Sequence, residues 1–199
     1  MTPLMLPTIE TPRLLLRDLA RTDAEAIFDY AQRPDVGPMA GWEPHQSLED
    51  TYRFIHYSIK KRDYGQPGVF AIVLKATNTV IGTIEIHSYQ DFKAEIGFVL
   101  HPTYWNQGLT TEAAKAVIIY AMEILELKRL AYCHFPNNVP SKRVCEKLGF
   151  TFEGVLRDKF LRYDGVLLDD VTYAILASDY FAGNIPWVAA FKRDVMFDY

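Results

Sequence analysis

The chain has few cysteines, no long apolar run and no excess of basic residues, and each of these shortages excludes a class of protein. Its two cysteines, Cys133 and Cys145, form neither a metal-ligand cluster nor a disulfide framework. No apolar run approaches the roughly 20 residues that cross a bilayer, so we expect no membrane contact. A formal net charge of -4 argues against direct binding of nucleic acid, because general nucleic-acid binders are basic.

The beginning of the chain also lacks the pattern of a secretory signal. The segment MTPLMLPTIE contains two prolines and has no basic region followed by an apolar stretch. Together with the low cysteine count, this predicts a reduced, cytoplasmic protein without a bound metal. The 199 residues are 49% hydrophobic and 14% aromatic, which is enough for one sizeable core in one domain.

Apolar patterns predict a mixed sheet covered by helices. Strands are predicted at 13–19, 69–75, 79–87, 94–100 and 129–135, and the segments 152–163 and 166–176 form a hairpin around Asp164-Gly165. Helices are predicted after the capping pattern Thr22-x-x-Glu25, after Ser47, over 113–125 and over 141–148. The strand–helix–strand unit across 94–135 implies at least one parallel pair of strands.

The stretch YWNQGLTTEAAKAV, residues 104–117, places a glycine loop before the most apolar helix. In the plain interpretation, Gly108 makes a turn and a threonine caps the helix. In the other interpretation, exposed N–H groups and the helix dipole bind a phosphate or pyrophosphate. The segment matches neither the Walker pattern nor the G-x-G-x-x-G dinucleotide pattern. This stretch alone leaves both interpretations open.

Several segments in order resemble the GNAT superfamily of N-acetyltransferases. They are TPRLLLR (11–17), WEPHQSLED (42–50), EIGFVLHPTYWNQGLTTEA (95–113) and PNNVPSKRVCEKLGFTFEGVLRD (136–158). Within the superfamily the chain is similar to the RimJ/RimL-like branch of ribosomal-protein alanine N-acetyltransferases. The resemblance implies an α/β (α+β) GNAT fold, with a mostly antiparallel sheet of about seven strands and four main helices. It implies one domain over 1–180, leaving 181–199 as an extension that packs on the domain or a subunit interface.

The resemblance also implies a site for acetyl-CoA as cosubstrate. The family's pyrophosphate loop R/Q-x-x-G-x-G/A falls on residues 105–110, where Trp105 and Thr110 depart from the pattern. The expected cofactor-binding residues are Phe98, Val99, Leu100, Trp105, Asn106, Gln107, Gly108, Leu109, Thr110, Thr111, Asn138 and Ser141. The backbone of 98–100 would line the pantetheine arm, as the edge of a strand lines a peptide.

Two catalytic residues are expected, Glu95 and Ser141. The family often has a carboxylate at the position of Glu95 that accepts the substrate proton through water, and Glu85 and His87 are the alternatives. Many members carry a tyrosine proton donor where this chain has Cys145, so the role of the donor passes to Ser141 or to water. An acyl-cysteine at Cys145 is the competing mechanism, although a cysteine inside a short amphipathic helix is typical of a core residue.

The acceptor predicted from these residues is a protein or peptide N-terminal α-amine. The alternatives are a small amine such as a polyamine, an amino acid or an antibiotic, or a non-catalytic module that binds acyl-CoA. A basic peptide or a ribosomal protein is the expected partner, because Glu43, Asp91, Asp164 and Asp169 in the predicted acceptor loops favour a cation. The expected assembly is a monomer or a homodimer. The apolar segment 181–199 is expected to pack rather than to remain solvated.

Overall fold

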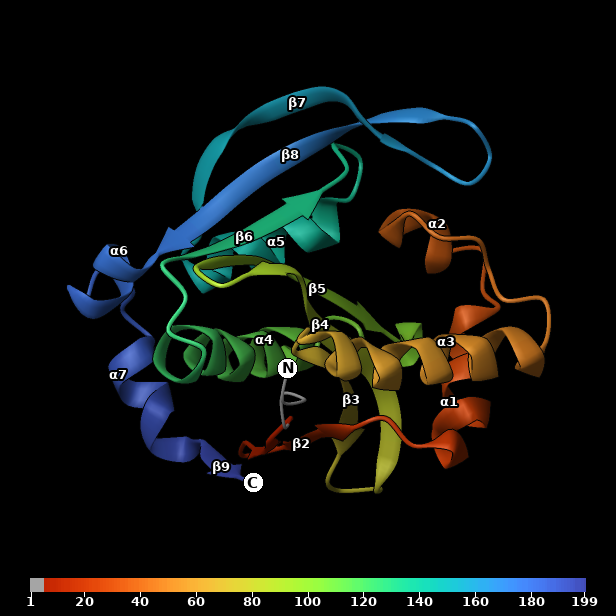
Figure 1. The fold of residues 1–199 in the computed structure, drawn as a ribbon, viewed down its shortest axis with the longest axis horizontal. Coiled ribbons are helices and arrows are strands. Elements are labelled where there is room, and N and C mark those ends of the chain that lie inside the picture. Colours follow the sequence, from red (N-terminus) through yellow and green to blue (C-terminus); the bar gives the residue numbers. More distant parts are fainter. Residues whose placement is uncertain (1–5) are drawn as a thin grey trace.

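Seven strands form where the apolar runs of the sequence predict them. The computed structural model describes residues 6–199, so the first five residues of the domain expected over 1–180 lie outside the described part. The seven strands are β2 (Leu14–Asp18), β3 (Gly68–Leu74), β4 (Thr79–Gln90), β5 (Lys93–Leu100), β6 (Arg129–His134), β7 (Thr151–Leu161) and β8 (Leu167–Leu176). They lie in one mixed, mostly antiparallel sheet, which confirms the predicted fold class (Figure 1).

The sheet has nine strands in the described residues, and the prediction of about seven is corrected here. The two additional strands are β1 (Thr8–Glu10) and β9 (Met196–Asp198), and the strand order is β7-β8-β6-β5-β4-β3-β2-β1-β9. Each has only three residues, too few for the alternation of apolar and polar residues that identifies a strand in a sequence. They form because β1 pairs with both β2 and β9.

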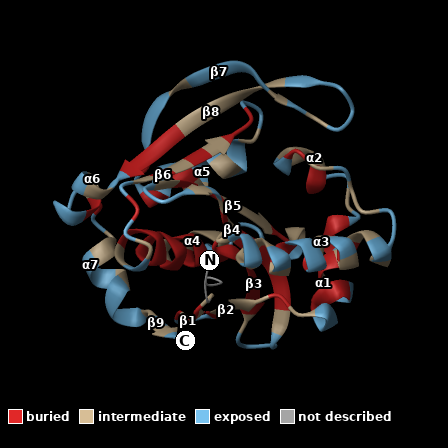
Figure 2. Cartoon of the chain, in the orientation of Figure 1, coloured by how far each residue is buried: buried red, intermediate tan, exposed pale blue. Residues whose placement is uncertain are grey.

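Helices cover both faces of the sheet. The α-helices are α1 (Ala24–Ala31), α2 (Gly37–Ala40), α3 (Leu48–Lys60), α4 (Leu109–Ile119), α5 (Val139–Leu148), α6 (Ala177–Phe181) and α7 (Val188–Phe191). A π-helical turn, Tyr120–Ile124, continues α4. Most residues of α4 are buried, as its colouring in Figure 2 shows. This helix therefore forms the centre of the larger of two apolar clusters.

The two predicted helix starts have different outcomes. Ser47 is the N-cap of α3, as the sequence predicts. Its N–H and hydroxyl both donate to the Asp50 carboxylate. The predicted cap at Thr22 is wrong. The buried Asp23 carboxylate accepts the Ala20 N–H at 2.8 Å and a bidentate pair of hydrogen bonds from Arg17. These bonds hold Arg21–Asp23 as a 3₁₀ turn, so α1 begins at Ala24.

Strands β5 and β6 pair over a short distance and then separate. The predicted parallel pair is present, but its register covers only Lys93↔Arg129, Ala94↔Leu130 and Glu95↔Ala131. Beyond Glu95, β5 remains paired with β4 on its other side through to Leu100. One edge of β5 therefore leaves alternate backbone N–H and C=O groups without a neighbouring strand. This opening in the sheet positions the candidate site.

The hairpin of β7 and β8 extends over the opening. Its tip reaches toward α2 in Figure 1, and a side chain at Gly41 would place its Cβ 2.6 Å from the ring of Phe160. The Phe160 ring also lies 5.2 Å from the ring of Phe135 at the end of β6. Strand β7 is the edge of the sheet and is exposed along almost all of its length (Figure 2). Its pairing with β8 is interrupted by register shifts at Phe152/Gly154 and Leu156/Phe160.

The last 19 residues lie against α4 and β1. The Trp187 indole N–H donates to the carbonyl of Leu148 at 2.9 Å, and the rings of Trp187 and Phe191 pack under the Lys115 ammonium on α4. Strand β9 pairs with β1 and completes the sheet on that side. The segment thus covers the face of α4 turned away from the sheet.

We predict that deleting residues 186–199 destabilises the protein. The deletion removes partly buried aromatic side chains and exposes both α4 and the edge of β1, so the midpoint of thermal unfolding should fall by at least about 5 °C. Lys192→Ala is the matched control, because it removes only the exposed ion pair with Glu123 and should shift the midpoint by less than about 2 °C. Circular dichroism melts measure both, and an unchanged midpoint after the deletion would show that the packing is not stabilising.

Candidate functional site

The loop before α4 has the backbone geometry of an anion-binding site. Asn106 and Gly108 both have positive φ angles, 61° and 74°, and Gly108 is the N-cap residue. The hydrogen bond from Glu112 N–H to the Gly108 carbonyl is 3.0 Å long and begins the helix. The N–H groups of Leu109, Thr110 and Thr111 precede it and face out of the helix start, where the helix dipole is positive.

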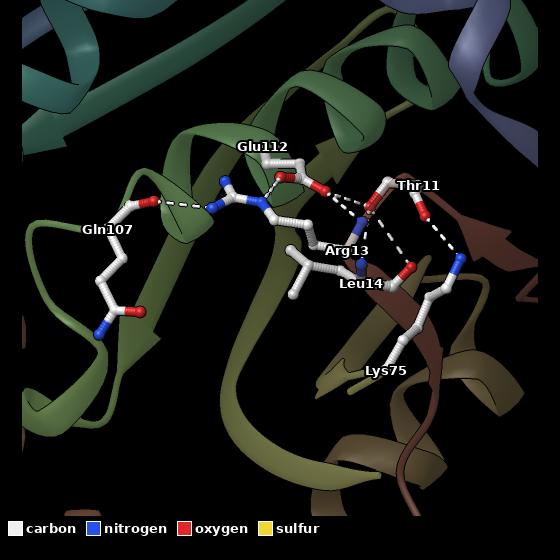
Figure 3. Close-up of polar contacts among 6 residues, drawn as sticks. All are labelled: Thr11, Arg13, Leu14, Lys75, Gln107 and Glu112. Carbon is white, nitrogen blue, oxygen red and sulfur yellow. Dashed lines mark hydrogen bonds and ion pairs between the residues drawn. The ribbon is translucent and has the colours of Figure 1, made fainter. Parts of the chain in front are cut away.

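Side chains on either side of the loop fix its shape. The Trp105 indole N–H donates to the carbonyl of Leu100, the last residue of β5, at 2.7 Å. The Gln107 amide donates to the Thr103 carbonyl at 3.0 Å. The main-chain carbonyl of Gln107 accepts a hydrogen bond from Arg13, so this carbonyl points toward the turn between β1 and β2 (Figure 3). Gln107 lies outside the cavity described next, unlike the other loop residues predicted to bind the cofactor.

A cavity of about 960 Å³ occupies the opening between β5 and β6. Its walls come from the loop before α4, from β4, β5 and β6, from the start of α5, and from the segment around α2 and α3. The predicted site residues that line it are Glu95, Phe98, Val99, Leu100, Trp105, Asn106, Gly108, Leu109, Thr110, Thr111, Asn138 and Ser141. The fold therefore brings together residues that lie up to 46 positions apart in the sequence.

Asn138 and Ser141 lie at the start of α5. The Asn138 side-chain oxygen accepts the Ser141 N–H at 3.2 Å, and its amide donates to the Met39 carbonyl in α2 at 3.0 Å. Asn138 therefore caps α5 through the Ser141 backbone N–H and links α5 to α2. Cys145, one turn further along α5, is fully buried in the core.

Tyr132 is a site residue that the sequence did not identify. Its ring stacks on Phe98 across the opening, with centroids 5.3 Å apart and planes 18° from parallel. Burial raises the pKa of its phenol, which keeps the phenol protonated, and the neighbouring Ser141 hydroxyl acts more weakly in the opposite direction. A tyrosine hydroxyl on β6 thus lies near Ser141, although α5 carries no tyrosine. An alternating pattern in RLAYCHF indicated only a strand, so no local signal distinguished Tyr132.

Carboxylates gather on one face of the sheet beside the opening. Glu95 lies opposite His87, with Oε1 and Nε2 3.7 Å apart, and Glu85 forms a 2.6 Å ion pair with Lys61. Asp170 on β8 lines the same cavity, and burial together with the charge of Glu95 raises the pKa of its carboxyl. The cavity therefore offers a negatively charged wall to a cation.

The acidic residues that face the cavity are largely different from those expected. Of the four acceptor-loop residues named from the sequence, Glu43 lines the cavity, whereas Asp91, Asp164 and Asp169 lie outside it. Asp164 is paired with Arg162 at the hairpin tip, and Asp169 accepts the Asp158 N–H. Asp170 was missed because alternation along β8, which puts adjacent residues on opposite faces, cannot be assigned without knowing which face is covered.

Both cysteines are poor nucleophiles. Burial raises the pKa of the Cys133 thiol to about 12, and the charges of Glu95 and Asp170 act in the same direction. Burial also raises the pKa of the Cys145 thiol to about 12. Since the thiolate is the reactive form, neither thiol suits a covalent acyl intermediate at neutral pH.

Metal-binding clusters and membrane-spanning helices are both absent from the part of the chain that the structure describes. Among residues 6–199, no group of three or more His, Cys, Asp or Glu side chains is placed to hold a metal ion. In the same range, no helix combines the length and the apolar character needed to cross a membrane.

Comparison with known proteins gives a consistent family. Residues 13–151 match the acetyltransferase (GNAT) domain. The chain is 32% identical to the uncharacterized N-acetyltransferase YoaA of Bacillus subtilis, over 86% of this chain and 98% of that one. It is 33% identical to YdaF of the same organism, named provisionally as a ribosomal N-acetyltransferase, over 85% and 92%. A GNAT-family acetyltransferase from Bacillus anthracis superposes with a TM-score of 0.77 at 31% identity, over 86% and 99%.

We predict that Gly108→Glu weakens the binding of acetyl-CoA by at least about 100-fold, because it puts a carboxylate where the helix start would hold an anion. The fold should survive, since a Cβ at Gly108 meets only the Arg13 guanidinium, at 3.6 Å. The left-handed φ adds a strain of about 1–2 kcal/mol. Isothermal titration calorimetry measures the affinity.

Gly165→Glu provides the matched control for this substitution. Gly165 has a similar φ of 82° in open space at the hairpin tip, so the same strain arises far from the loop. The Gly165→Glu variant should bind acetyl-CoA with the same affinity as the wild type. Unchanged affinity in a folded Gly108→Glu protein would return the loop to the turn-and-cap interpretation.

Proposed function

The chain belongs to the GNAT acetyltransferase family, and from this premise we propose that it acetylates the α-amino group of a peptide or protein N-terminus, as a member of the RimJ/RimL-like branch. The protein is an acetyl-CoA-dependent N-acetyltransferase. The observation that carries the proposal is the position of Glu95, at the point where β5 and β6 separate and inside the cavity that Ser141 also lines.

The residues around the loop fit acetyl-CoA. The N–H groups at the start of α4 suit its pyrophosphate, and the unpaired edge of β5 suits its pantetheine arm. Bound acetyl-CoA supplies the activated acetyl group as a thioester. An N–H of the 98–100 segment would donate a hydrogen bond where negative charge develops on the acetyl oxygen, which is often a large contribution to catalysis.

Glu95 is better placed than Glu85 to accept the proton of the attacking amine. Lys61 already neutralises Glu85 through an ion pair of 2.6 Å, whereas Glu95 faces His87 at 3.7 Å and no lysine or arginine. A carboxylate that is not engaged by a permanent cation retains its capacity to accept a proton, directly or through one water molecule.

Ser141 and Tyr132 together would supply the proton that the departing sulfur takes. Ser141 lies at the start of α5, and the neighbouring Tyr132 on β6 lines the same cavity. The high pKa of the buried phenol keeps its proton available at neutral pH. A serine that donates its proton to the sulfur and regains one from solvent, with its hydroxyl oriented by the neighbouring phenol, would do the work of the family's tyrosine on α5, where this chain has Cys145.

The pKa of the amine favours an N-terminus as acceptor. Deprotonating an α-amine at pH 7 costs about 1 kcal/mol, whereas a lysine side chain costs about 5 kcal/mol. A single carboxylate that accepts the proton through water is sufficient for the smaller free-energy cost of deprotonating an α-amine. The contact between Gly41 and Phe160 restricts the cavity on the hairpin side, so an extended chain end would enter more easily than a side chain on a folded surface. The name of YdaF makes ribosomal proteins the first acceptors to test.

A polyamine is the second candidate, and the cavity carboxylates favour it. Glu95 and Asp170 lie on one face of the sheet, and a molecule with several ammonium groups would pair with both of them. A basic residue following the acetylated N-terminus would use the same carboxylates. The two candidates therefore differ in which amine reacts rather than in overall charge.

We predict that the purified enzyme acetylates free peptide N-termini more efficiently than other amines. The panel comprises peptides with a free α-amine and a basic second residue, the same peptides blocked at the N-terminus but carrying lysine, and spermidine. Mass spectrometry should show kcat/KM at least about 10-fold higher for the free α-amines, since deprotonation is easier. Turnover of spermidine without turnover of any peptide would replace the first candidate by the second.

Glu95→Gln should lower kcat by about 10²-fold without changing acetyl-CoA affinity.

We predict that Ser141→Ala lowers kcat by about 10- to 100-fold, because it removes the donor hydroxyl. Acetyl-CoA affinity should hardly change, since the cap of α5 uses the backbone N–H of residue 141. Tyr132→Phe is the companion variant, which retains the stack on Phe98 and should lower kcat by about 10-fold. Steady-state kinetics and calorimetry separate the two quantities. Weaker binding with unchanged kcat in Ser141→Ala would show that Ser141 only holds the cofactor and that the proton comes from solvent.

A further inference from the structure

We propose that Arg13 is a positioning residue for the pyrophosphate loop, acting through the carbonyl of Gln107 and the carboxylate of Glu112. This inference rests on the proposed binding of acetyl-CoA at the start of α4. Arg13 lies in the turn between β1 and β2, almost a hundred residues from the loop in the sequence, and Figure 3 shows its side chain between Gln107 and Glu112.

Glu112 joins the first turn of α4 to the N-terminal turn. One carboxylate oxygen accepts the Thr11 hydroxyl at 2.7 Å and the Arg13 backbone N–H at 2.9 Å, and the other accepts Arg13 Nε at 2.6 Å (Figure 3). Glu112 is only 8% exposed. A buried carboxylate with this many donors is strongly fixed, so it anchors the helix start to the N-terminal strands.

The Arg13 side chain continues from Glu112 to the loop. Its Nη1 donates to the Gln107 carbonyl at 3.0 Å. In a trans peptide the C=O and the following N–H point in opposite directions. Holding the Gln107 carbonyl toward Arg13 therefore turns the Gly108 N–H away from Arg13, toward the side of the loop that lines the cavity. Arg13 thus orients a donor that it does not touch.

Arg13 also changes the charge that a bound anion meets. A glutamate in the first turn stabilises the helix dipole, but its charge opposes an anion at the same helix start. The guanidinium neutralises that charge, and its Nη2 lies 3.6 Å from the position of a Cβ on Gly108. Without Arg13, Glu112 would keep its negative charge beside the phosphates.

The turn that carries Arg13 is itself rigid. The Thr11 N–H donates to the Leu14 carbonyl at 2.9 Å, and the backbone N–H of Lys75 donates to the Arg13 carbonyl at 3.0 Å. The Lys75 ammonium donates to the Thr11 carbonyl at 3.0 Å (Figure 3). The support for the loop is therefore the sheet rather than a flexible segment.

The test compares the affinities for acetyl-CoA, acetyl-dephospho-CoA and S-acetyl-pantetheine, of which only the last lacks the pyrophosphate. Arg13→Ala should weaken the first two by about 10-fold and leave the affinity for S-acetyl-pantetheine unchanged. Glu112→Gln should lower the midpoint of thermal unfolding, because it weakens the contacts between α4 and the N-terminal turn. It should not lower the affinity for acetyl-CoA, because it removes a negative charge and leaves the hydrogen bond from Arg13 to Gln107 in place. A purely structural cluster would lower stability and affinity together in both variants.

Two further variants keep the test decisive. The double variant Arg13→Ala/Glu112→Gln removes the unpaired buried carboxylate, so it remains testable if Arg13→Ala alone folds poorly, and its acetyl-CoA affinity should stay low because Gln107 is still released. Arg17→Ala is the matched control, since it breaks a similar bidentate pair, with Asp23, on β2 away from the loop. It should lower stability without changing any of the three affinities.

The outcomes separate this inference from the proposed function. If wild-type protein binds acetyl-CoA no better than S-acetyl-pantetheine, the loop does not bind pyrophosphate, and both proposals are overturned. If wild-type protein prefers acetyl-CoA and the double variant keeps the whole preference, only the role of Arg13 is overturned. Loss of that preference in the double variant, with Arg17→Ala unchanged, supports it.

Discussion

The short parallel pairing of β5 with β6 is the constraint on which the rest of the structure depends. Three residue pairs, ending at Glu95↔Ala131, hold the two halves of the sheet together. Past that point β5 has an unpaired edge, which is costly unless other groups compensate. The Trp105 indole satisfies the Leu100 carbonyl at the far end, and the stacked rings of Phe98 and Tyr132 fill the space between the strands. The opening is therefore stable without a strand to close it.

The separation of the strands also sorts charge. The start of α4 presents N–H groups on the loop side of the cavity, whereas Glu95 and Asp170 lie on the sheet face beside β6. In the function proposed above, an anionic cosubstrate and a cationic acceptor would be drawn to different parts of one cavity. Each part of the cavity attracts a substrate of the opposite charge, so electrostatic attraction would not favour either substrate in the place of the other. The Glu85–Lys61 pair removes one carboxylate from this balance and leaves Glu95 as the one facing only a histidine.

Local patterns predicted what depends on local sequence. The seven longer strands, the four longer helices and the Ser47 cap follow from apolar periodicity and capping chemistry. The three-residue strands β1 and β9 form only through their neighbours, and Asp23 displaced the Thr22 cap because Arg17 is paired with it in space. In the site, the loop and Glu95 came from family resemblance. Tyr132, Asp170 and Arg13 required the fold, because the roles proposed for them depend on neighbours that are distant in sequence, such as Ser141, Glu95 and Gln107.

The exposed edge strand β7 carries apolar side chains, among them Phe152, Val155 and Leu156, in the position where further chains would add to a sheet. Two register shifts interrupt it, with Gly154 and Asp158 at positive φ. Such bulges twist an edge out of plane and break the even row of N–H and C=O groups that an added strand would need. The irregularities in β7 thus protect a sheet with an apolar edge against growth into aggregates.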